Sequence, residues 1–501
     1  MTLPIELLRR RGGAERHDAV VVGAGIAGLT CGAVLARGGL RVVVVDQAKR
    51  PGGQLQTVSH QGYAIDLGPL FWDAREVNAA LAAAGVRELA LADLAVPGAY
   101  RVATVEGGSA LGDPRPLPLP GAVTSPATLD AVRFLYGVPP RVFAAVGEIY
   151  TELAAFEPAP DEASSALAFE PWLVERGVEP HVRAAALRSV ALLGAAEPGE
   201  ASLAAIARHA RWLGGGDLAR LGAPGDDPIA GARGVVQALV DALIDAGGEL
   251  RLGTRATGMA LDRGRFRALG IQREEPPFAE ELTADRCVLA LPPGALGELL
   301  PAESRSRLES ELAHPARARV GVAWAFRQVP TARSGAAGAE AGVLRLIAPA
   351  AAGSRAAGSP PGGAALPPGA LGKLPATLVW TSAHSARVAP PEHGLLLAQV
   401  SLSAAQAADL YQVALAAAHL RSVVAELYRG VDELLEFERH WVLRETWPDP
   451  FAAPRLPAAL PGCDGLFAAG VAVKTAGEIA VGVGAEALSG LRTAERILTQ
   501  R

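Results

Sequence analysis

A glycine-rich turn between an apolar strand and a helix constrains this chain most. Residues 18–23 read DAVVVG, an apolar run typical of a strand that is buried on both faces. GAGIAG follows at 23–28, and a helical stretch then ends at Gly38–Gly39. A second apolar strand, RVVVVD, occupies 41–46. Strand, turn, helix and strand within about thirty residues form a βαβ unit, which predicts an α/β fold with a parallel sheet.

The spacing of the three glycines indicates a dinucleotide-binding turn. Gly23 allows the tight turn, Gly25 lets the backbone approach a pyrophosphate, and Gly28 lets the helix pack closely on the strand. The N-terminus of the helix offers free N–H groups and a partial positive charge to phosphates. Asp46 ends the next strand and can accept hydrogen bonds from ribose hydroxyls, and its carboxylate disfavours the 2′-phosphate of NADP. The alternative is a glycine-rich turn without a ligand.

The segments after Asp46 carry a family resemblance. RPGGQLQT at 50–57 and GYAIDLGPLF at 62–71 resemble the FAD-binding N-terminus of the flavin amine oxidase superfamily. That superfamily includes amine oxidases, carotenoid desaturases and protoporphyrinogen oxidases. The resemblance implies that Gly52–Gly53 wraps the FAD pyrophosphate and that the strand at 62–68 passes the isoalloxazine.

Three later blocks resemble the same superfamily. Residues 231–261 are similar to its helix and adenine-contacting strand, which places Ala256 at the adenine. CVLALPPGAL at 287–296 resembles the strand that returns to the FAD domain. GLFAAGV at 465–471 and the helix that ends near Ile497 resemble the C-terminal block. In this block the helix N-terminus points at the flavin pyrimidine ring, where its dipole can stabilise negative charge.

These motifs and the resemblance predict one set of cofactor-binding residues, all for FAD. The set is Gly23, Ala24, Gly25, Ile26, Ala27, Gly28, Asp46, Gln47, Arg50, Gly52, Gly53, Gln54, Gly68, Pro69, Leu70, Ala256, Gly470, Val471 and Val481.

The chain departs from the family pattern at three of its positions. Gln54 replaces the usual arginine after Gly-Gly, so Arg50 is the candidate substitute cation. Val471 replaces an aspartate that commonly bonds the cofactor. Glu486 near the flavin would oppose negative charge there, so we expect its side chain to face solvent.

The order of elements predicts a Rossmann-type FAD-binding domain that is discontinuous, plus a mixed α+β substrate domain. The FAD domain takes 1–105, 225–295 and 455–501. The substrate domain takes 106–224, which is largely helical, and 296–454. Residues 331–372 are rich in Ala, Gly, Pro and Ser, and we expect a long, mobile surface loop there.

Composition excludes several other classes of protein. The composition, with 50% hydrophobic residues and a net charge of −5, predicts a large core and no nucleic-acid-binding surface. Three widely separated cysteines and scattered histidines indicate neither a disulfide framework nor a metal site. We find no secretory signal and no apolar run that spans a membrane, so we expect a cytoplasmic protein. The segment 3–11 gives a weak hint of peripheral contact with the inner face of the membrane, against the alternative of a frayed terminus.

The function predicted first is FAD-dependent hydride transfer from an apolar substrate to flavin N5, as the resemblance to carotenoid desaturases implies. Amine oxidases use an aromatic cage, yet no Phe, Tyr or Trp follows Phe467. The first alternative is an amine or protoporphyrinogen oxidase that uses O₂. The second is an FAD-binding protein without turnover. Substrate, electron acceptor and oligomeric state stay open.

Catalytic residues are not identified by any motif. Lys474 and Trp447 are weak candidates near the expected flavin, with a surface lysine and a loop anchor as the alternatives. Trp441 is a further candidate for the substrate cavity, or for core packing. The chain has a single dinucleotide motif, so we expect no second pyridine-nucleotide domain, and electrons would leave to O₂, a quinone or the substrate.

Overall fold

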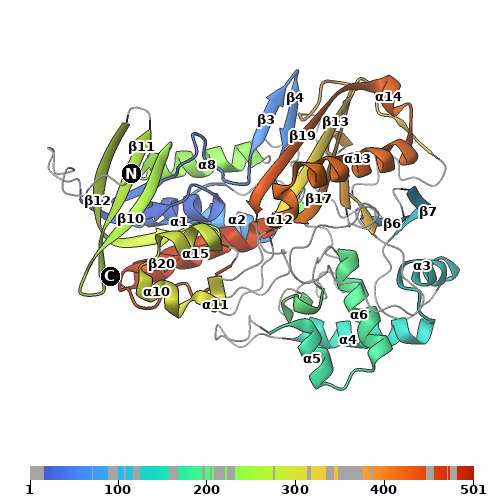
Figure 1. Ribbon diagram of the computed structural model, residues 1–501, viewed down its shortest axis with the longest axis horizontal. Helices are drawn as coiled ribbons and strands as arrows, with labels where there is room; N and C mark the ends of the chain where they lie inside the picture. Colours follow the sequence, from blue (N-terminus) through green and yellow to red (C-terminus); the bar gives the residue numbers. More distant parts are fainter. Residues whose placement is uncertain are drawn as a thin grey trace.

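Two seven-stranded sheets stand side by side in the computed structural model of this chain (Figure 1). The structure describes residues 16–69, 72–87, 100–106, 109–116, 125–156, 167–193, 198–203, 206–207, 221–222, 232–274, 277–312, 317–333, 343–347, 376–383, 387–446, 456–470, 472–473 and 482–500.

The first sheet has a parallel core that begins with the predicted βαβ unit. Its strand order is β10-β11-β12-β1-β2-β9, and β20 pairs with β12. All pairs among β9, β2, β1, β12 and β20 are parallel, whereas β10, β11 and β12 form an antiparallel meander. The strands are β1 (Arg16–Val22), β2 (Val42–Val45), β9 (Glu249–Arg251), β10 (Thr254–Asp262), β11 (Arg265–Glu274), β12 (Pro277–Leu289) and β20 (Leu466–Ala468).

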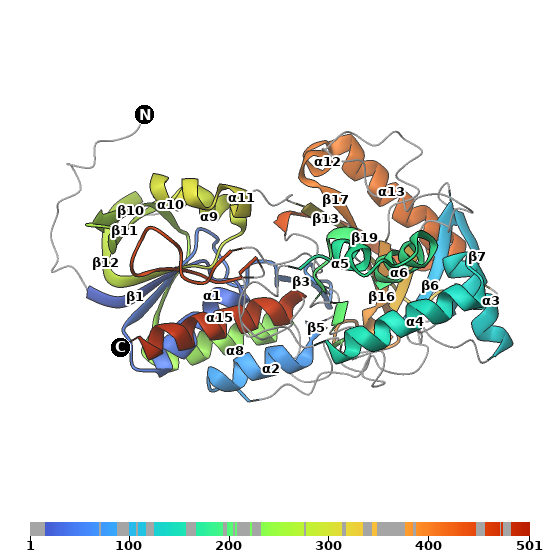
Figure 2. The ribbon, with the colours of Figure 1, turned by 90° about the horizontal axis from the view of Figure 1, so that it is seen from below.

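Helices cover both faces of this sheet, which explains why β2 and the part of β1 from Ala19 onward are apolar. On one face lie α1 (Ile26–Arg37), α2 (Ala74–Ala83), α8 (Ala232–Asp245) and α15 (Gly482–Thr499). On the other lie α9 (Pro293–Leu299), α10 (Ala302–Arg307) and α11 (Glu309–Leu312) (Figure 2). The Rossmann-type fold predicted from the sequence is confirmed.

The second sheet has the strand order β19-β13-β17-β16-β15-β6-β7. One of its faces packs against α13 through a core that contains Val320, Val322 and Trp324. The strands are β6 (Tyr100–Glu106), β7 (Ser109–Pro116), β13 (Arg317–Phe326), β15 (Val343–Ile347), β16 (Ala376–Trp380), β17 (Gly394–Ser403) and β19 (Leu435–Thr446). The helices beside it are α12 (Ala404–Ala408), α13 (Leu410–Leu427) and α14 (Val431–Leu434).

Two consecutive helices, α12 and α13, are separated at Asp409. The Asp409 side chain accepts a hydrogen bond from the Tyr411 N–H at 2.8 Å and so caps α13. An N-cap residue has extended backbone angles, so one helix ends and the next begins there.

A helical lobe and a hairpin complete the arrangement. The lobe contains α3 (Pro126–Tyr136), α4 (Pro140–Ala155), α5 (Phe169–Glu175) and α6 (Pro180–Leu193), in the region predicted to be largely helical. The hairpin joins β3 (Thr57–His60) to β4 (Tyr63–Asp66) and lies beside β13 and β19 (Figure 1). Short strand pairs join β5 (Trp72–Asp73) to β8 (Leu221–Gly222) and β14 (Thr331–Ala332) to β18 (Tyr428–Arg429).

Three expected boundaries need correction. Strand β6 pairs with β15 in the second sheet, so residues 100–105 leave the first domain. Helices α9 to α11 pack on the first sheet through Leu296, Leu300 and Leu308, although the sequence assigned 296 onward to the substrate domain. Strand β15 lies within the expected loop 331–372, because its short apolar run pairs with both β16 and β6. Residues 348–375 of that loop lie outside the described residues.

Candidate functional site: a dinucleotide edge between the two sheets

Four parallel strands of the first sheet end at one edge. Strands β1, β2, β12 and β20 end there, and backbone hydrogen bonds join the residues that follow them. The Ala290 N–H donates to Val22 O at 2.8 Å, and the Ala469 N–H donates to Leu289 O at 3.0 Å. In open α/β sheets, ligands bind at the carboxyl ends of the strands. The candidate site is therefore this edge.

The three motif glycines divide into two that pack and one that stays open. A Cβ at Gly23, where φ is +106°, would lie 2.3 Å from Ala290 O. A Cβ at Gly28 would lie 1.9 Å from Gly23 O. A Cβ at Gly25 would meet no atom within 4 Å. Gly23 and Gly28 are thus needed for packing, whereas Gly25 leaves backbone accessible to an approaching group.

Asp46 holds this turn and retains capacity to accept further hydrogen bonds. Its Oδ2 accepts from the Ala24 N–H at 2.7 Å, and its Oδ1 accepts from the Ala48 N–H at 2.7 Å. A carboxylate has about four lone-pair sites, so two acceptor positions remain. The Asp46 carbonyl also accepts from the Thr254 N–H at 2.8 Å, which brings β10 and the half-buried Ala256 beside the turn.

The second glycine turn rests directly on the first. The Gly52 N–H donates to Ala24 O at 2.7 Å. A Cβ at Gly53 would lie 3.1 Å from Gly25 Cα. Both Gly52 and Gly53 have positive φ, at +113° and +58°, which glycine adopts without strain. The next residue, Gln54, has its Oε1 buried with no hydrogen-bond partner among the described residues.

The hairpin strand fixes the start of α8 through a buried carboxyl group. Thr57 Oγ1 donates to Asp66 Oδ1 at 2.5 Å and accepts from the Arg233 N–H at 3.1 Å. The Ala232 N–H also donates to the Asp66 carboxylate. Burial raises the pKa of Asp66, although the hydrogen bonds from the Thr57 hydroxyl and the Ala232 N–H favour its ionised form.

Helix α15 reaches the same edge from the C-terminal end of the chain. The Gly470 N–H donates to Ser489 Oγ at 3.0 Å, and Thr493 Oγ1 donates to Ala468 O at 3.0 Å. A Cβ at Gly490 would lie 2.2 Å from Ala27 O, so α15 and α1 approach each other backbone to backbone. At Gly470, φ is +133° and a Cβ would meet no atom of the described residues within 4 Å. Gly470 is the second open glycine of this edge.

The expectation that Glu486 faces solvent is wrong. Its side chain is half-buried on α15, close to the edge that holds Gly470. Burial raises the pKa of Glu486 to about 8, and the positive charge of Arg319 on β13 opposes this rise. Arg319 therefore lies close enough for its charge to act on this carboxyl group. Glu486 is therefore largely protonated and uncharged at pH 7.

The remaining predicted residues are distributed unevenly. Gln47 and Arg50 have exposed side chains beside the turn, and Pro69 is half-buried next to the buried Gly68. Leu70, Trp447, Val471, Lys474 and Val481 lie outside the described residues, so their predicted roles stay predictions.

The sequence analysis missed two polar residues of the second sheet that approach this edge. Arg319 lies near Glu486, and Gln399 donates to the backbone that follows β4. Neither belongs to a motif. Only the strand register, which aligns Gly321 with Gln399, could have suggested that Gln399 shares a face with Trp441.

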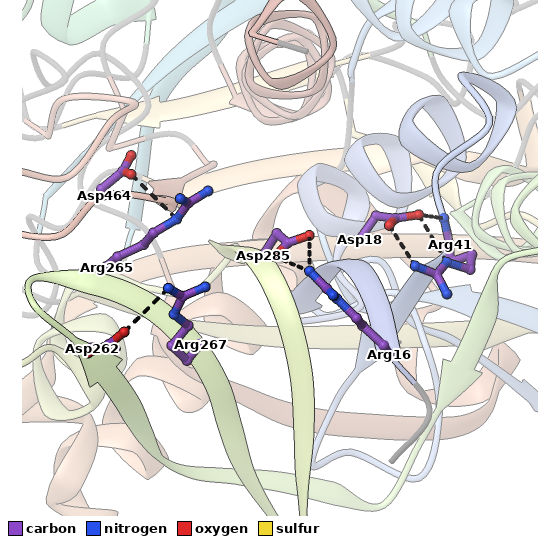
Figure 3. A network of polar contacts seen from close by, with 8 residues as sticks. All are labelled: Arg16, Asp18, Arg41, Asp262, Arg265, Arg267, Asp285 and Asp464. Carbon is purple, nitrogen blue, oxygen red and sulfur yellow. Dashed lines mark hydrogen bonds and ion pairs between the residues drawn. The ribbon is translucent and has the colours of Figure 1, made fainter. Parts of the chain in front are cut away.

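The opposite edge of the first sheet has a different character. It carries exposed ion pairs at the starts of the strands, including Arg16 with Asp285 at 3.0 Å and Arg41 with Asp18 at 2.9 Å (Figure 3). Among the described residues no cluster of His, Cys, Asp or Glu could hold a metal ion, and no helix is long and apolar enough to cross a membrane. The three cysteines are buried and unpaired.

The residues present fit a dinucleotide. Gly25 and Gly470 leave space in which a ligand can reach the backbone, Asp46 retains acceptor positions, and the buried Gln54 Oε1 lacks a donor. A ribose or ribityl hydroxyl is a donor of the kind that this oxygen needs.

Comparison with known proteins supports the fold. Residues 21–83 match the NAD(P)-binding Rossmann-like domain. Over 95% of this chain and 100% of the other, the structure resembles an oxidoreductase from Methanosarcina mazei with a TM-score of 0.63 and 14% identity. An Exiguobacterium protein assigned as a protoporphyrinogen oxidase covers 98% of this chain with a TM-score of 0.60 and 16% identity, over 100% of its own length.

The chain shares its fold with these two proteins. Sequence similarity is concentrated in a short segment. Over 70 residues the chain is 49% identical to a hydroxyneurosporene desaturase from Rubrivivax gelatinosus, which is 14% of this chain and 13% of that protein. Over 56 residues it is 38% identical to a phytoene desaturase from Cercospora nicotianae, which is 11% and 9% of the two chains. The chain thus matches only about an eighth of the length of the first relative.

Proposed function

We propose that this chain is an FAD-dependent oxidoreductase that removes hydride from an apolar substrate, as carotenoid desaturases do. The observation that carries the proposal is the edge where β1, β2, β12 and β20 end. There Gly25 and Gly470 leave open space among the described residues, and the buried Oε1 of Gln54 has no hydrogen-bond partner among them. FAD, when bound, supplies the hydride acceptor.

The residues of the edge bind and orient the cofactor rather than react. The N–H groups at the start of α1 would bind the pyrophosphate, and Asp46 would accept a hydrogen bond from the adenosine ribose. Gly52 and Gly53 bring the second turn against the first. With Gln54 in place of arginine, the phosphates depend on backbone N–H groups and on the exposed Arg50 for positive charge.

Glu486 holds its proton at neutral pH, so it adds no negative charge beside the cofactor. The N-terminus of α15 can therefore favour negative charge on the cofactor without repulsion from Glu486. A protonated carboxyl group can also donate a hydrogen bond, which an ionised one cannot do.

An apolar substrate is favoured by two observations. No aromatic residue follows Phe467, so the ring that amine oxidases take from their C-terminal block is missing. Two relatives that share the nucleotide-binding segment are named hydroxyneurosporene desaturase and phytoene desaturase, and three are named all-trans-retinol 13,14-reductases, one of them inactive.

An absorption spectrum of the purified protein, with and without added FAD, tests cofactor binding. Bound oxidised flavin is the expected result, and failure to take up FAD would overturn the proposal. Anaerobic addition of polyenes and of amines, followed at the flavin band, tests the substrate class. Bleaching by amines alone would contradict the apolar substrate.

An amine or protoporphyrinogen oxidase that uses O₂ is the second candidate. The similarity of the fold to a protein assigned as a protoporphyrinogen oxidase favours it. Peroxide release on addition of the substrate distinguishes it from a desaturase that passes its electrons elsewhere.

A further inference from the structure

The second sheet turns a largely apolar face, crossed by a polar row, toward the FAD-binding part of the chain. Ala323, Ala325, Leu395 and Leu397 of this face pack against the hairpin residues Tyr63 and Ile65. The polar row crosses three strands, where Trp441, Gly321 and Gln399 lie directly opposite one another. A buried polar side chain is costly unless it is hydrogen-bonded.

The side chains of this row donate to the backbone of the other domain. Gln399, which is 8% exposed, donates from Nε2 to Leu67 O at 3.2 Å and to Gly68 O at 2.6 Å. Trp441 Nε1 donates to Leu67 O at 2.8 Å. Two consecutive carbonyl groups after β4 are thus held by donors from two strands of the second sheet.

Gly321 allows this arrangement. A Cβ at Gly321 would lie 2.1 Å from Trp441 Cε2, so the indole lies across β13 only because no side chain stands there. The φ of Gly321 is not positive, so steric space alone explains the requirement for glycine at this position.

The segment held by these donors, residues 67–68, packs directly against the residues that follow the second glycine turn. A Cβ at Gly68 would lie 2.3 Å from Gln54 O, and the Leu67 N–H donates to Gln56 O at 2.8 Å. Residues 67–68 therefore lie between the polar row and the residues that follow Gly52–Gly53. A shift at Gln399 would be transmitted to Gln54 through one layer of backbone.

We propose that Gln399 and Trp441, seated over Gly321, are positioning residues that set the Gly52–Gln54 turn at its distance from the second sheet. We call these three residues the clamp. The proposal rests on the proposed function in one respect, because the turn is taken to hold FAD. It adds that residues of the substrate-binding sheet, none of which belongs to a nucleotide-binding motif, determine how the cofactor is held.

The test replaces each hydrogen-bond donor of the clamp by an apolar side chain that cannot donate but still fills most of the space. Gln399→Met removes the amide that serves both carbonyls, and Trp441→Phe removes the indole N–H while an aromatic ring stays over Gly321. Gln237→Met is the matched control, because Gln237 lies on the exposed face of α8 and donates only to Asp241 at 2.8 Å. Trp172→Phe, in the helical lobe, is the control for the aromatic change.

Hydrogen–deuterium exchange of the protein without added FAD is the first readout. For Gln399→Met we expect faster exchange in the peptides that cover 52–56 and 67–69. For Trp441→Phe we expect a smaller increase in the exchange rate of the same peptides. The two control variants should exchange in these peptides as the wild type does. Unchanged exchange in the Gln399→Met and Trp441→Phe double variant would overturn the clamp, whether or not FAD binds.

FAD affinity and the visible circular dichroism of the bound flavin are the second readout. Loss of the Gln399 amide leaves a buried carbonyl without a donor, so we expect FAD to bind about tenfold more weakly. The circular dichroism should change because the turn moves. If the wild type takes up no FAD, the proposed function fails. The hydrogen–deuterium exchange result still shows whether the clamp holds the turn. If the wild type binds FAD and the double variant binds it identically, the clamp fails alone.

Discussion

The two edges of the first sheet are built in opposite ways. At the carboxyl edge, backbone packs on backbone, and Gly23, Gly28 and Gly68 have no room for a side chain. At the amino edge, long charged side chains such as Arg16 and Arg41 form ion pairs in solvent (Figure 3). The comparison teaches that the edge proposed to bind FAD is specified by the absence of side chains. A single added methyl group should therefore matter more there than the loss of a whole side chain at the other edge.

Gly28→Ala should give the largest effect. Its Cβ would lie 1.9 Å from Gly23 O, and that carbonyl belongs to the turn itself, so it cannot move without disturbing β1. We expect the free energy of unfolding to fall by about 4 kcal/mol. Urea unfolding of the protein without FAD, followed by circular dichroism, measures the loss.

Gly25→Ala is the matched control for that substitution. Gly25 has φ of −74° and open space around it, so alanine fits both the backbone and the packing. We expect a stability change of less than about 1 kcal/mol, together with weaker FAD binding because the added methyl group occupies the approach to the phosphates. Equal destabilisation by the two alanines would contradict the division between packing and open glycines.

Glu486 should give the next largest effect, as a dependence of stability on pH. Its folded pKa of about 8 lies above the ordinary value of 4.5, so the folded state binds the proton more tightly than the unfolded state. Between these two values the free energy of unfolding must fall as pH rises, and outside them this group contributes no slope. We expect a loss on the order of 3 kcal/mol between pH 5 and pH 8.

Glu486→Gln should remove that slope and should be more stable than the wild type at pH 8. The measurement is urea unfolding of the protein without FAD at several pH values. The exposed Glu309 supplies the control, since Glu309→Gln should leave the pH profile unchanged. Parallel profiles for the wild type and Glu486→Gln would show that the Glu486 carboxyl group reaches solvent after all.

Thr57→Val tests a side-chain contact near the carboxyl edge. The change leaves the buried Asp66 without its hydroxyl donor and the Arg233 N–H without its acceptor. We expect the free energy of unfolding to fall by about 2 kcal/mol and the pKa of Asp66 to rise further above its ordinary value. Thermal unfolding measures the loss, and Thr57→Ser, which keeps the hydroxyl group, should recover most of it.

The contrast between backbone and side-chain contacts also explains how far the sequence predicts this site. Gly23, Gly25, Gly28 and Asp46 stand within one βαβ unit, so their spacing predicts both their fold and their place at one edge. The parallel core and the helical lobe followed from periodicity in the same way. Short-range patterns are sufficient where each contact is made within a few dozen residues.

The contribution of the second sheet could not be predicted in that way. Gln399 meets Leu67 across 332 positions of the chain, and Trp441 meets it across 374. Both contacts depend on the strand order of a sheet whose strands come from four distant segments. Glu486 was misjudged because the sequence does not show which parts of the chain surround the start of α15, where burial raises the pKa of its carboxyl group. A polar side chain in an otherwise apolar strand was the only local signal.

Arg16→Met at the amino edge should give the smallest effect. One guanidinium nitrogen of Arg16 contacts both carboxylate oxygens of Asp285, at 3.0 Å and 3.2 Å, yet the two side chains are 61% and 29% exposed. Solvent screens such a pair, so we expect a change of about 0.5 kcal/mol or less, reduced further in high salt. Urea unfolding at low and high salt measures it. A loss comparable with that of Gly28→Ala would mean that the amino edge also depends on exact contacts, and the distinction between the two edges would fail. A small loss would leave the ion pairs with a role in solubility, and would leave the backbone contacts at the carboxyl edge as the feature that sets where a cofactor can bind.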